Sequence, residues 1–395
     1  MHISPSQRTA RTPAKRRRVC NQPLCGSCEG RFQSIPSQPL KAKCSPSESF
    51  WGLGLLEESE PSIDWDALTF SFTETDRMFM ATCELGEKWQ LGSMLDYQNL
   101  SMSPAAGVLN YGQGLFEGMK ARRAVDGRIL LFRPELNARR SAAGCERLGM
   151  PPVPEEMFLD AVRRVVKENE RWLPPTGHGE LYVRPLIFGS GAILGVAPAP
   201  EYKFLVYCVP VGPYFKGGLS PISLTVSDDF HRAAPGGSGG VKAIGNYAPG
   251  MMPSKRAKAK GFAEIIYLDS THHRYVEEVG AANFFCVHDG VIYTPELTGT
   301  ILPGITRLSI IELAGSLGYE VRETKVEIDF AMAADECFCA GTAAVISPIG
   351  SIEHGGEVAN FSNGEVGPVT MEIWKALTDI MNGRSTDDFG WTPSV

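Results

Sequence analysis

The chain contains 395 residues, of which 43% are hydrophobic, and its formal net charge at pH 7 is −7. This length and composition are sufficient for two sizeable hydrophobic cores, and no run of about 18 apolar residues is present to span a membrane. The acidic balance argues against a nucleic-acid partner.

The first 46 residues differ from the rest of the chain in charge. They contain nine Lys or Arg residues against one acidic residue, Glu29, and they are rich in Ser and Pro. Because they lack the apolar core of a secretory signal, residues 1–50 are expected to form an organellar transit peptide or disordered leader. Three early prolines disfavour a continuous amphipathic helix, which favours a plastid over a mitochondrion as the destination. A disordered cytosolic tail, or a nuclear signal at residues 15–18, remain alternatives.

Cysteines are concentrated in the leader. Cys20, Cys25 and Cys28 have the C-x4-C-x2-C spacing of plant-type ferredoxin clusters. A polar leader provides no core to shield a cluster, so no metal site is expected. The later cysteines lie mostly in apolar stretches and are expected to be buried thiols, and Cys337 and Cys339 do not form a C-x-x-C redox pair.

Residues 51–210 are expected to form a small N-terminal α/β domain. Three strands are expected, over 129–132, 181–186 and 204–209. A helix is expected after Pro134, and a second over 154–170, where apolar residues recur at helical spacing. The turn-rich stretch 211–218 is the expected interdomain linker.

Residues 219–395 are expected to form a larger C-terminal cofactor-binding domain. Four strands are expected, over 222–226, 263–269, 283–287 and 291–294. The last two are separated by His-Asp-Gly, which predicts a hairpin with Gly290 at positive φ. The fold class is therefore predicted as α/β (mixed α+β) with two domains.

The stretch 236–247, GGSGGVKAIGNY, presents one lysine on a glycine-dense loop. Lys242 on such small residues can form a Schiff base with a carbonyl cofactor, and Tyr247 is near enough to tune it. The alternative is a solvated surface charge. Downstream, Glu278 lies five positions before Asn283, at the mouth of an apolar strand, and can face a ring nitrogen.

A lysine for the cofactor aldehyde and a carboxylate for a ring nitrogen are two of the parts that pyridoxal phosphate needs from a protein. The third is a group that anchors its phosphate. Arg140 in LLFRPELNARR is one candidate. The segment TILPGITR is another, because Gly304, Ile305 and Thr306 can offer backbone N–H groups and a hydroxyl at the start of a helix. The adjacent Arg139 is an alternative to Arg140.

Seven strings in chain order, LNYGQGLFEGMKA, LLFRPELNARR, LYVRPLIFGSGA, GGVKAIGNYA, EEVGAANFF, LPGITR and AGTAAVISPIG, identify a family resemblance. From about Ser62 to the C-terminus the chain resembles the plant-like branched-chain amino acid aminotransferases, which are class IV (fold type IV) enzymes using pyridoxal 5'-phosphate. The resemblance implies two α/β domains with the cofactor at their interface, and a homodimer. It also implies ping-pong transamination of Leu, Ile and Val with 2-oxoglutarate, giving branched-chain 2-oxo acids and L-glutamate.

The resemblance assigns roles to particular residues. Lys242 would be the Schiff-base lysine, Tyr247 the hydroxyl on the phenolic oxygen of the cofactor, and Glu278 the partner of the pyridine nitrogen. The phosphate would be held by Arg140, Ile305, Thr306 and Thr342. Substrate would meet aromatic walls at Tyr111, Phe116, Tyr182 and Tyr214, with Arg184 on the distal carboxylate and Thr342 and Ala343 on the α-carboxylate. Core packing is the alternative for each aromatic residue, and an ordinary strand-entry carboxylate is the interpretation of Glu277.

Other functions are weaker interpretations of the same sequence. D-amino acid aminotransferase and aminodeoxychorismate lyase are the competitors within the fold. The run GGSGG could belong to a nucleotide-dependent oxidoreductase, but it lacks the G-x-G-x-x-G spacing and the acidic residue about 20 positions on. A non-catalytic binding relative is disfavoured because the three cofactor-binding parts are all present.

Overall fold

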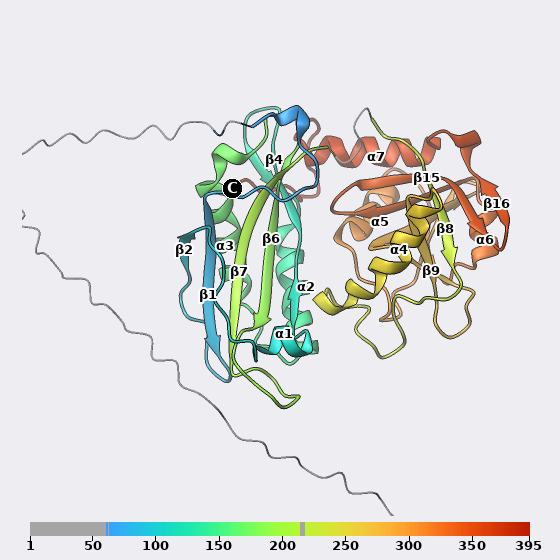
Figure 1. The fold of residues 1–395 in the computed structure, drawn as a ribbon. Coiled ribbons are helices and arrows are strands. Elements are labelled where there is room, and N and C mark those ends of the chain that lie inside the picture. The colour runs from blue at the N-terminus through green and yellow to red at the C-terminus, as the bar shows by residue number, and fades with distance from the viewer. Residues whose placement is uncertain (1–60, 62, 214–217) are drawn as a thin grey trace, which may run out of the picture. The chain divides into compact units, whose positions relative to one another are not determined.

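The computed structural model describes residue 61 and residues 63–213 and 218–395 (Figure 1). The predicted leader, its cysteines and Tyr214 lie outside these residues. The described residues belong to one compact unit, Ser59–Val395. Among the described helices, none has the length and apolar character that crossing a membrane requires.

Seven antiparallel strands form the first sheet, in the order β2-β1-β7-β6-β4-β5 with β3 paired to β6. Their bounds are β1 Arg77–Glu84, β2 Ser93–Asp96, β3 Gly114–Phe116, β4 Met119–Arg123, β5 Ile129–Leu131, β6 Glu180–Gly189 and β7 Glu201–Val211. The three strands expected in this part of the chain are confirmed as β5, β6 and β7, and β6 and β7 are longer than expected.

Helices α2 (Pro134–Arg147) and α3 (Glu155–Glu168) accompany this sheet (Figure 1), and the short α1 (Gly107–Tyr111) precedes β3. The apolar residues of α3 at helical spacing are buried, and Phe158 stacks on Phe204 of β7 with ring centroids 5.7 Å apart. Pro134 is at the first turn of α2, where its missing N–H costs no hydrogen bond. Both predicted helices are thus confirmed.

Nine strands form the second sheet, in the order β10-β9-β8-β15-β14-β11-β12-β13 with β16 paired to β15. Their bounds are β8 Ile222–Ser227, β9 Glu264–Leu268, β10 Val276–Val279, β11 Ala282–His288, β12 Val291–Pro295, β13 Val321–Thr324, β14 Glu336–Gly341, β15 Val345–His354 and β16 Glu357–Asn360. Strand β10 also pairs with β11, so six of these strands close on themselves as a barrel. The predicted hairpin is confirmed between β11 and β12, with Gly290 at a φ of 75°.

Four α-helices belong to this second part: α4 Met251–Ala259, α5 Ile305–Ser316, α6 Ile328–Met332 and α7 Pro368–Met381. Helices α5 and α7 pack around stacked Phe285 and Phe338, whose ring centroids are 4.9 Å apart. Short 3-10 turns complete the structure, at Trp65–Ala67, Glu170–Trp172, Ile244–Asn246, Ala248–Gly250 and Ser362–Gly364. The mixed α/β class predicted from sequence is confirmed. The chain passes from the first sheet to the second between Val211 and Ile222.

Candidate active site

The glycine-dense loop that carries Lys242 is held in place by one side chain. Asn246 donates to the carbonyl oxygens of Ser238 and Val241 at 2.7 and 2.8 Å, and its Oδ1 accepts from the Ser238 hydroxyl at 2.6 Å. A Cβ at Gly239 would lie 2.2 Å from the Thr300 carbonyl oxygen, so only glycine fits there. The loop therefore presents Lys242 from a fixed backbone.

The same loop joins the first sheet through its backbone. The N–H of Phe116, the last residue of β3, donates to the Lys242 carbonyl at 3.2 Å, and Leu115 forms a bridge with Ala243. The backbone of the lysine loop is thus joined to β3 of the first sheet.

The Lys242 ammonium lies among aromatic and cationic groups. Its Nζ is 3.2 Å from the Tyr247 hydroxyl and 4.7 Å from the centre of the Phe116 ring. Burial lowers the pKa of Lys242 to about 8, and the nearby Arg140 guanidinium lowers it in the same direction. Burial also raises the pKa of Tyr247 to about 12, so that its hydroxyl keeps its proton at neutral pH. Lys242 is therefore much closer to the neutral amine than a surface lysine.

Glu278 lies inside β10 and is buried. Its Oε1 accepts from the Leu302 N–H at 3.0 Å and from the Asn283 amide at 3.2 Å, and its Oε2 contacts the Nε of Arg232. Burial raises the pKa of Glu278 to about 7, while Arg232 opposes that shift. The charge of Lys242 also lowers the pKa of Glu278.

Glu277 differs from its sequence-based interpretation as an ordinary strand-entry carboxylate. It is only 4% exposed and occupies the second position of β10. The pairing of β10 with β9 shifts register between Val276 and Glu278, so Glu277 is the extra residue of an irregularity in the strand. Glu277 lines a hollow that does not include Glu278. Burial raises the pKa of Glu277, and the hydroxyl of Thr300 opposes the shift.

Arg140 is fixed by an acidic partner that sequence reasoning missed. Its guanidinium donates to both carboxylate oxygens of the fully buried Glu117, at 2.8 and 2.6 Å. Asn137, one helical turn earlier in α2, donates to the same carboxylate at 2.7 Å. The Nη1 of Arg140 also donates to the Pro303 carbonyl at 3.0 Å, two residues before α5 begins. Arg139, the alternative, is exposed and pairs with Glu155.

The start of α5 provides the other expected anion donors. Ile305 and Thr306 are its first two residues, Thr306 is buried, and no side chain caps the helix. Their N–H groups therefore retain the partial positive charge of a helix N-terminus. Thr342, on the turn between β14 and β15, donates its hydroxyl to the Gly118 carbonyl at 3.4 Å. The structure thus brings Arg140 and the start of α5 together through Pro303.

Three expected substrate contacts form a second cluster, around β6. The Cζ of Arg184 lies 4.5 Å from the centre of the Phe116 ring, and its Nη2 is 3.2 Å from the Tyr182 hydroxyl. The Nε of Arg184 is buried and has no hydrogen-bond partner in the described part of the chain. Phe116 is shared with Lys242, so the two predicted groups of residues form one site.

Two expected wall residues do not join this site in the structure. Tyr111 is 40% exposed, and its hydroxyl donates to the Leu194 carbonyl instead. Tyr214 lies outside the described residues. The carbonyl of Ala343 accepts from the Nζ of Lys120 at 2.6 Å, and Lys120 lines a pocket together with Thr306 and Thr342.

Glu117, Lys120 and Arg232 are the residues that sequence reasoning missed. The first two are in LFEGMKA, where two charged residues interrupt an otherwise apolar stretch of sequence, and a buried charge requires a partner. That pattern was a usable signal. Arg232 is in a loop whose composition carries no such signal, and only the fold shows its contact with Glu278. Among the described residues, no group of three or more His, Cys, Asp or Glu side chains is arranged to hold a metal ion.

Comparison with known proteins gives consistent results. The family model for amino-transferase class IV matches residues 114–352. The "Branched-chain amino acid aminotransferase 2, chloroplastic" of Humulus lupulus is 52% identical, over 84% of this chain and 81% of its own. The mitochondrial enzyme 1 of the same plant is 45% identical, over 92% and 90%.

Solved structures agree with these relatives. The branched-chain amino acid aminotransferase of Escherichia coli superimposes with a TM-score of 0.70 at 30% identity, covering 81% of this chain and 99% of its own. The branched-chain aminotransferase of the archaeon Thermoproteus uzoniensis, solved with norvaline, has a TM-score of 0.70 at 27% identity, covering 81% and 99%. A further branched-chain amino acid aminotransferase, solved with pyridoxamine 5'-phosphate, has a TM-score of 0.70 at 28% identity, covering 81% and 98%.

Proposed function

Because the chain belongs to the amino-transferase class IV family, we propose that it is a branched-chain-amino-acid transaminase. It transfers the amino group of L-Leu, L-Ile or L-Val to 2-oxoglutarate, with pyridoxal 5'-phosphate as cofactor. The observation that carries the proposal is the buried amine of Lys242, which lies 3.2 Å from the Tyr247 hydroxyl and whose pKa burial lowers to about 8.

The described residues fit this cofactor. An amine with a pKa of about 8 reacts with an aldehyde at physiological pH, whereas an ordinary lysine is almost fully protonated. Glu278 is poised near pH 7, and a positive ring nitrogen beside it would favour its ionised form. Arg140, Ile305, Thr306 and Thr342 are the proposed phosphate ligands, because cationic and helix N-terminal groups bind phosphate.

Pyridoxal phosphate, when bound, supplies an electron sink that makes the substrate Cα–H acidic. Lys242 would have two tasks, because its Nζ would tether the cofactor and, once released, would carry the proton removed from Cα. The Tyr247 hydroxyl, 3.2 Å from Nζ, orients the amine. Glu278 holds the proton on the pyridine nitrogen, and Arg232 keeps Glu278 in place.

Two kinds of substrate must use one pocket in the ping-pong reaction. Phe116 and Tyr182 present apolar ring faces to an aliphatic side chain. The unpartnered Nε of Arg184 is available to the distal carboxylate of glutamate or 2-oxoglutarate. Thr342 and Ala343 are assigned to the α-carboxylate, and Tyr214 to the pocket wall.

We also propose that the enzyme works as a homodimer, with residues 51–210 and 219–395 as its small and large domains joined by 211–218. The Tyr111 hydroxyl donates to the carbonyl of Leu194, and the side chains of Leu194 (90%) and of Val196 (88%), two residues later, are almost fully exposed. Exposed apolar groups of this kind are commonly covered by a partner, and a second copy would give Tyr111 a place in a pocket. Sedimentation of the purified protein measures the dimer directly.

The predicted leader and the chloroplastic relative support a plastid location for this enzyme, with the mitochondrion as alternative. The function is tested by one panel: purified holoenzyme with 2-oxoglutarate and L-Leu, L-Ile, L-Val or D-Ala. Turnover of the three L-amino acids supports the proposal. Turnover of D-Ala alone indicates the D-amino acid enzyme, and a protein with no bound visible chromophore contradicts the cofactor assignment.

A further inference from the structure

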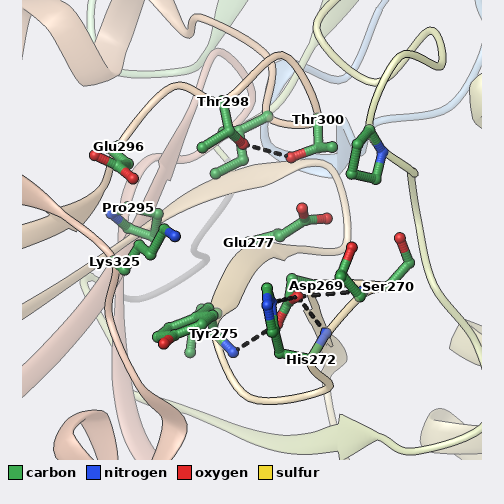
Figure 2. Close-up of a pocket in the computed structure, with 14 residues that line it drawn as sticks. Asp269, Ser270, His272, Tyr275, Glu277, Pro295, Glu296, Thr298, Thr300 and Lys325 are labelled. Carbon is green, nitrogen blue, oxygen red and sulfur yellow. Dashed lines mark hydrogen bonds and ion pairs between the residues drawn. The ribbon is translucent and has the colours of Figure 1, made fainter.

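A hollow with a volume of about 180 Å³ lies beside β10 and is separate from the Lys242 cluster (Figure 2). Its lining includes Glu277 but none of Lys242, Tyr247 and Glu278. Figure 2 shows the Glu277 side chain in the middle of the lining residues, below Thr298 and Thr300. The proposed transamination uses none of these three lining residues.

Glu277 is a buried acid with an unused acceptor. Its side chain is 4% exposed, and its Oε2 has no hydrogen-bond partner in the described part of the chain. The hydroxyls of Thr298 and Thr300 are 2.9 Å apart and are hydrogen-bonded to each other. A buried carboxylate oxygen without a donor is costly, so a donor from a ligand would be strongly favoured there.

The charged side chains that line the hollow indicate the sign of the charge that such a ligand would carry. Glu296 and Asp269 add two further carboxylates to the lining, and Lys325 is the cationic lysine among them. Asp269 accepts from the backbone N–H groups of its own loop, including that of Tyr275 at 2.9 Å, so it is already satisfied. The acidic excess favours a cation over an anion.

The apolar residues that line the hollow indicate what the uncharged part of the ligand would be. Val276 and Ile301 are buried apolar residues of the lining, and Pro235 and Pro295 extend the apolar surface. A metal ion gains nothing from such walls, and no cluster of metal-ligating side chains is present among the described residues. An organic ammonium ion with an apolar body matches both the acid and the walls.

The hollow is connected to Glu278 by short contacts. The Thr300 carbonyl accepts from the Nη1 of Arg232 at 2.7 Å, and the same guanidinium contacts the Glu278 carboxylate. Two residues after Thr300, the Leu302 N–H donates to Glu278 at 3.0 Å. The segment that lines the hollow therefore also supplies the groups that hold Glu278.

We propose that this hollow binds a small organic ammonium ion with an apolar body, and that its occupancy alters the environment of Glu278. The second half rests on the proposed function, because it assumes that Glu278 faces the bound cofactor. Glu277 is then the residue that recognises the ligand, and it has no part in the transfer of the amino group.

The test uses N-methylpyrrolidinium as probe with the full-length holoenzyme. This tertiary ammonium offers one N–H donor and cannot form a Schiff base, so it does not consume the cofactor. Calorimetry should show saturable binding that Glu277→Gln weakens by about 10-fold or more, the effect of losing a charge-assisted hydrogen bond. Glu296→Gln is the matched control at the rim, and it should weaken binding by less than about 3-fold, as expected of a partly exposed charge.

Equal affinity of the wild type and Glu277→Gln, or no saturable binding to the wild type, overturns the site. If Glu277→Gln does not fold, Thr298→Lys serves instead, because a lysine at this exposed rim position places its own ammonium in the hollow and should block the probe. These binding results do not depend on which amino acids the enzyme transaminates.

The link to Glu278 has its own readout. The absorbance of the bound cofactor is titrated with pH, with and without saturating probe. A midpoint that moves in the wild type but not in Glu277→Gln supports the link, and an unmoved midpoint in the saturated wild type overturns it.

Discussion

Replacing Arg184 with alanine should separate the two substrates of the proposed enzyme. The guanidinium already donates to Tyr182 and packs on Phe116, and its buried Nε remains free of protein partners among the described residues. A distal carboxylate would therefore gain one charge-assisted hydrogen bond that leucine cannot make, a contribution of roughly 1.5 to 3 kcal/mol. We expect Arg184→Ala to slow the 2-oxoglutarate half-reaction about 10- to 150-fold more than the leucine half-reaction, at about 1.4 kcal/mol per tenfold.

Stopped-flow absorbance measures the two half-reactions separately. Loss of packing against Phe116 affects both substrates, so the ratio of the two losses isolates the hydrogen bond. Arg123→Ala is the control, because Arg123 ends the neighbouring strand β4 and pairs with Glu170 at 3.3 Å. Comparable losses for leucine and 2-oxoglutarate would mean that Arg184 maintains the shape of the pocket and does not read the carboxylate.

Four further predictions concern the cofactor and the leader. Lys242→Ala should abolish turnover and leave the fold intact, and visible absorbance that survives dialysis would show that another lysine is the tether. Glu278→Gln should lower kcat at least about 10-fold more than Glu277→Gln while cofactor affinity changes little, because an amide cannot hold the pyridinium proton; equal effects of the two variants would refute the assignment. The rate at which apoenzyme captures pyridoxal phosphate should rise with pH with a midpoint near 8, since only the neutral Lys242 amine reacts and its pKa is lowered to about 8. A midpoint near 10.5 would contradict this. Deleting residues 1–50 should leave specific activity unchanged and move a tagged protein from an organelle to the cytosol. An unaltered cellular distribution of the truncated protein would show that the segment is not a targeting signal.

Local patterns were sufficient for part of the fold. The apolar spacing over 154–170 predicted α3 to within two residues at its C-terminal end, and the Asp-Gly dipeptide before Val291 predicted the β11–β12 hairpin. Nine strands were not predicted: β1, β2, β3, β4, β10, β13, β14, β15 and β16. Three of them, β2, β13 and β16, are four residues long and contain no buried residue, whereas β1, β14 and β15 are longer and largely buried. Their pairing depends on neighbours distant in sequence, which periodicity does not report.

Some residues of the candidate site could be found from the sequence, and others only from the structure. Motifs located Lys242 and Glu278, but they gave no information about Arg232, whose importance is visible only in its contact across the fold. Glu277 was misjudged because alternation along a strand cannot show that both faces are covered. Tyr111 illustrates the opposite case, since a residue suggested by resemblance lies exposed in the single chain.

The barrel of the second sheet has a consequence for when the protein acquires its cofactor. Strand β8 pairs with β15, more than a hundred residues later, so the wall that carries the lysine loop cannot close until Val345–His354 has been synthesised. Pairings of such long sequence separation form late and slowly. A nascent chain that lacks β15 therefore has the Lys242 loop but no enclosed pocket around it. The structure thus ties the formation of the cofactor pocket to synthesis of the chain through Val345–His354.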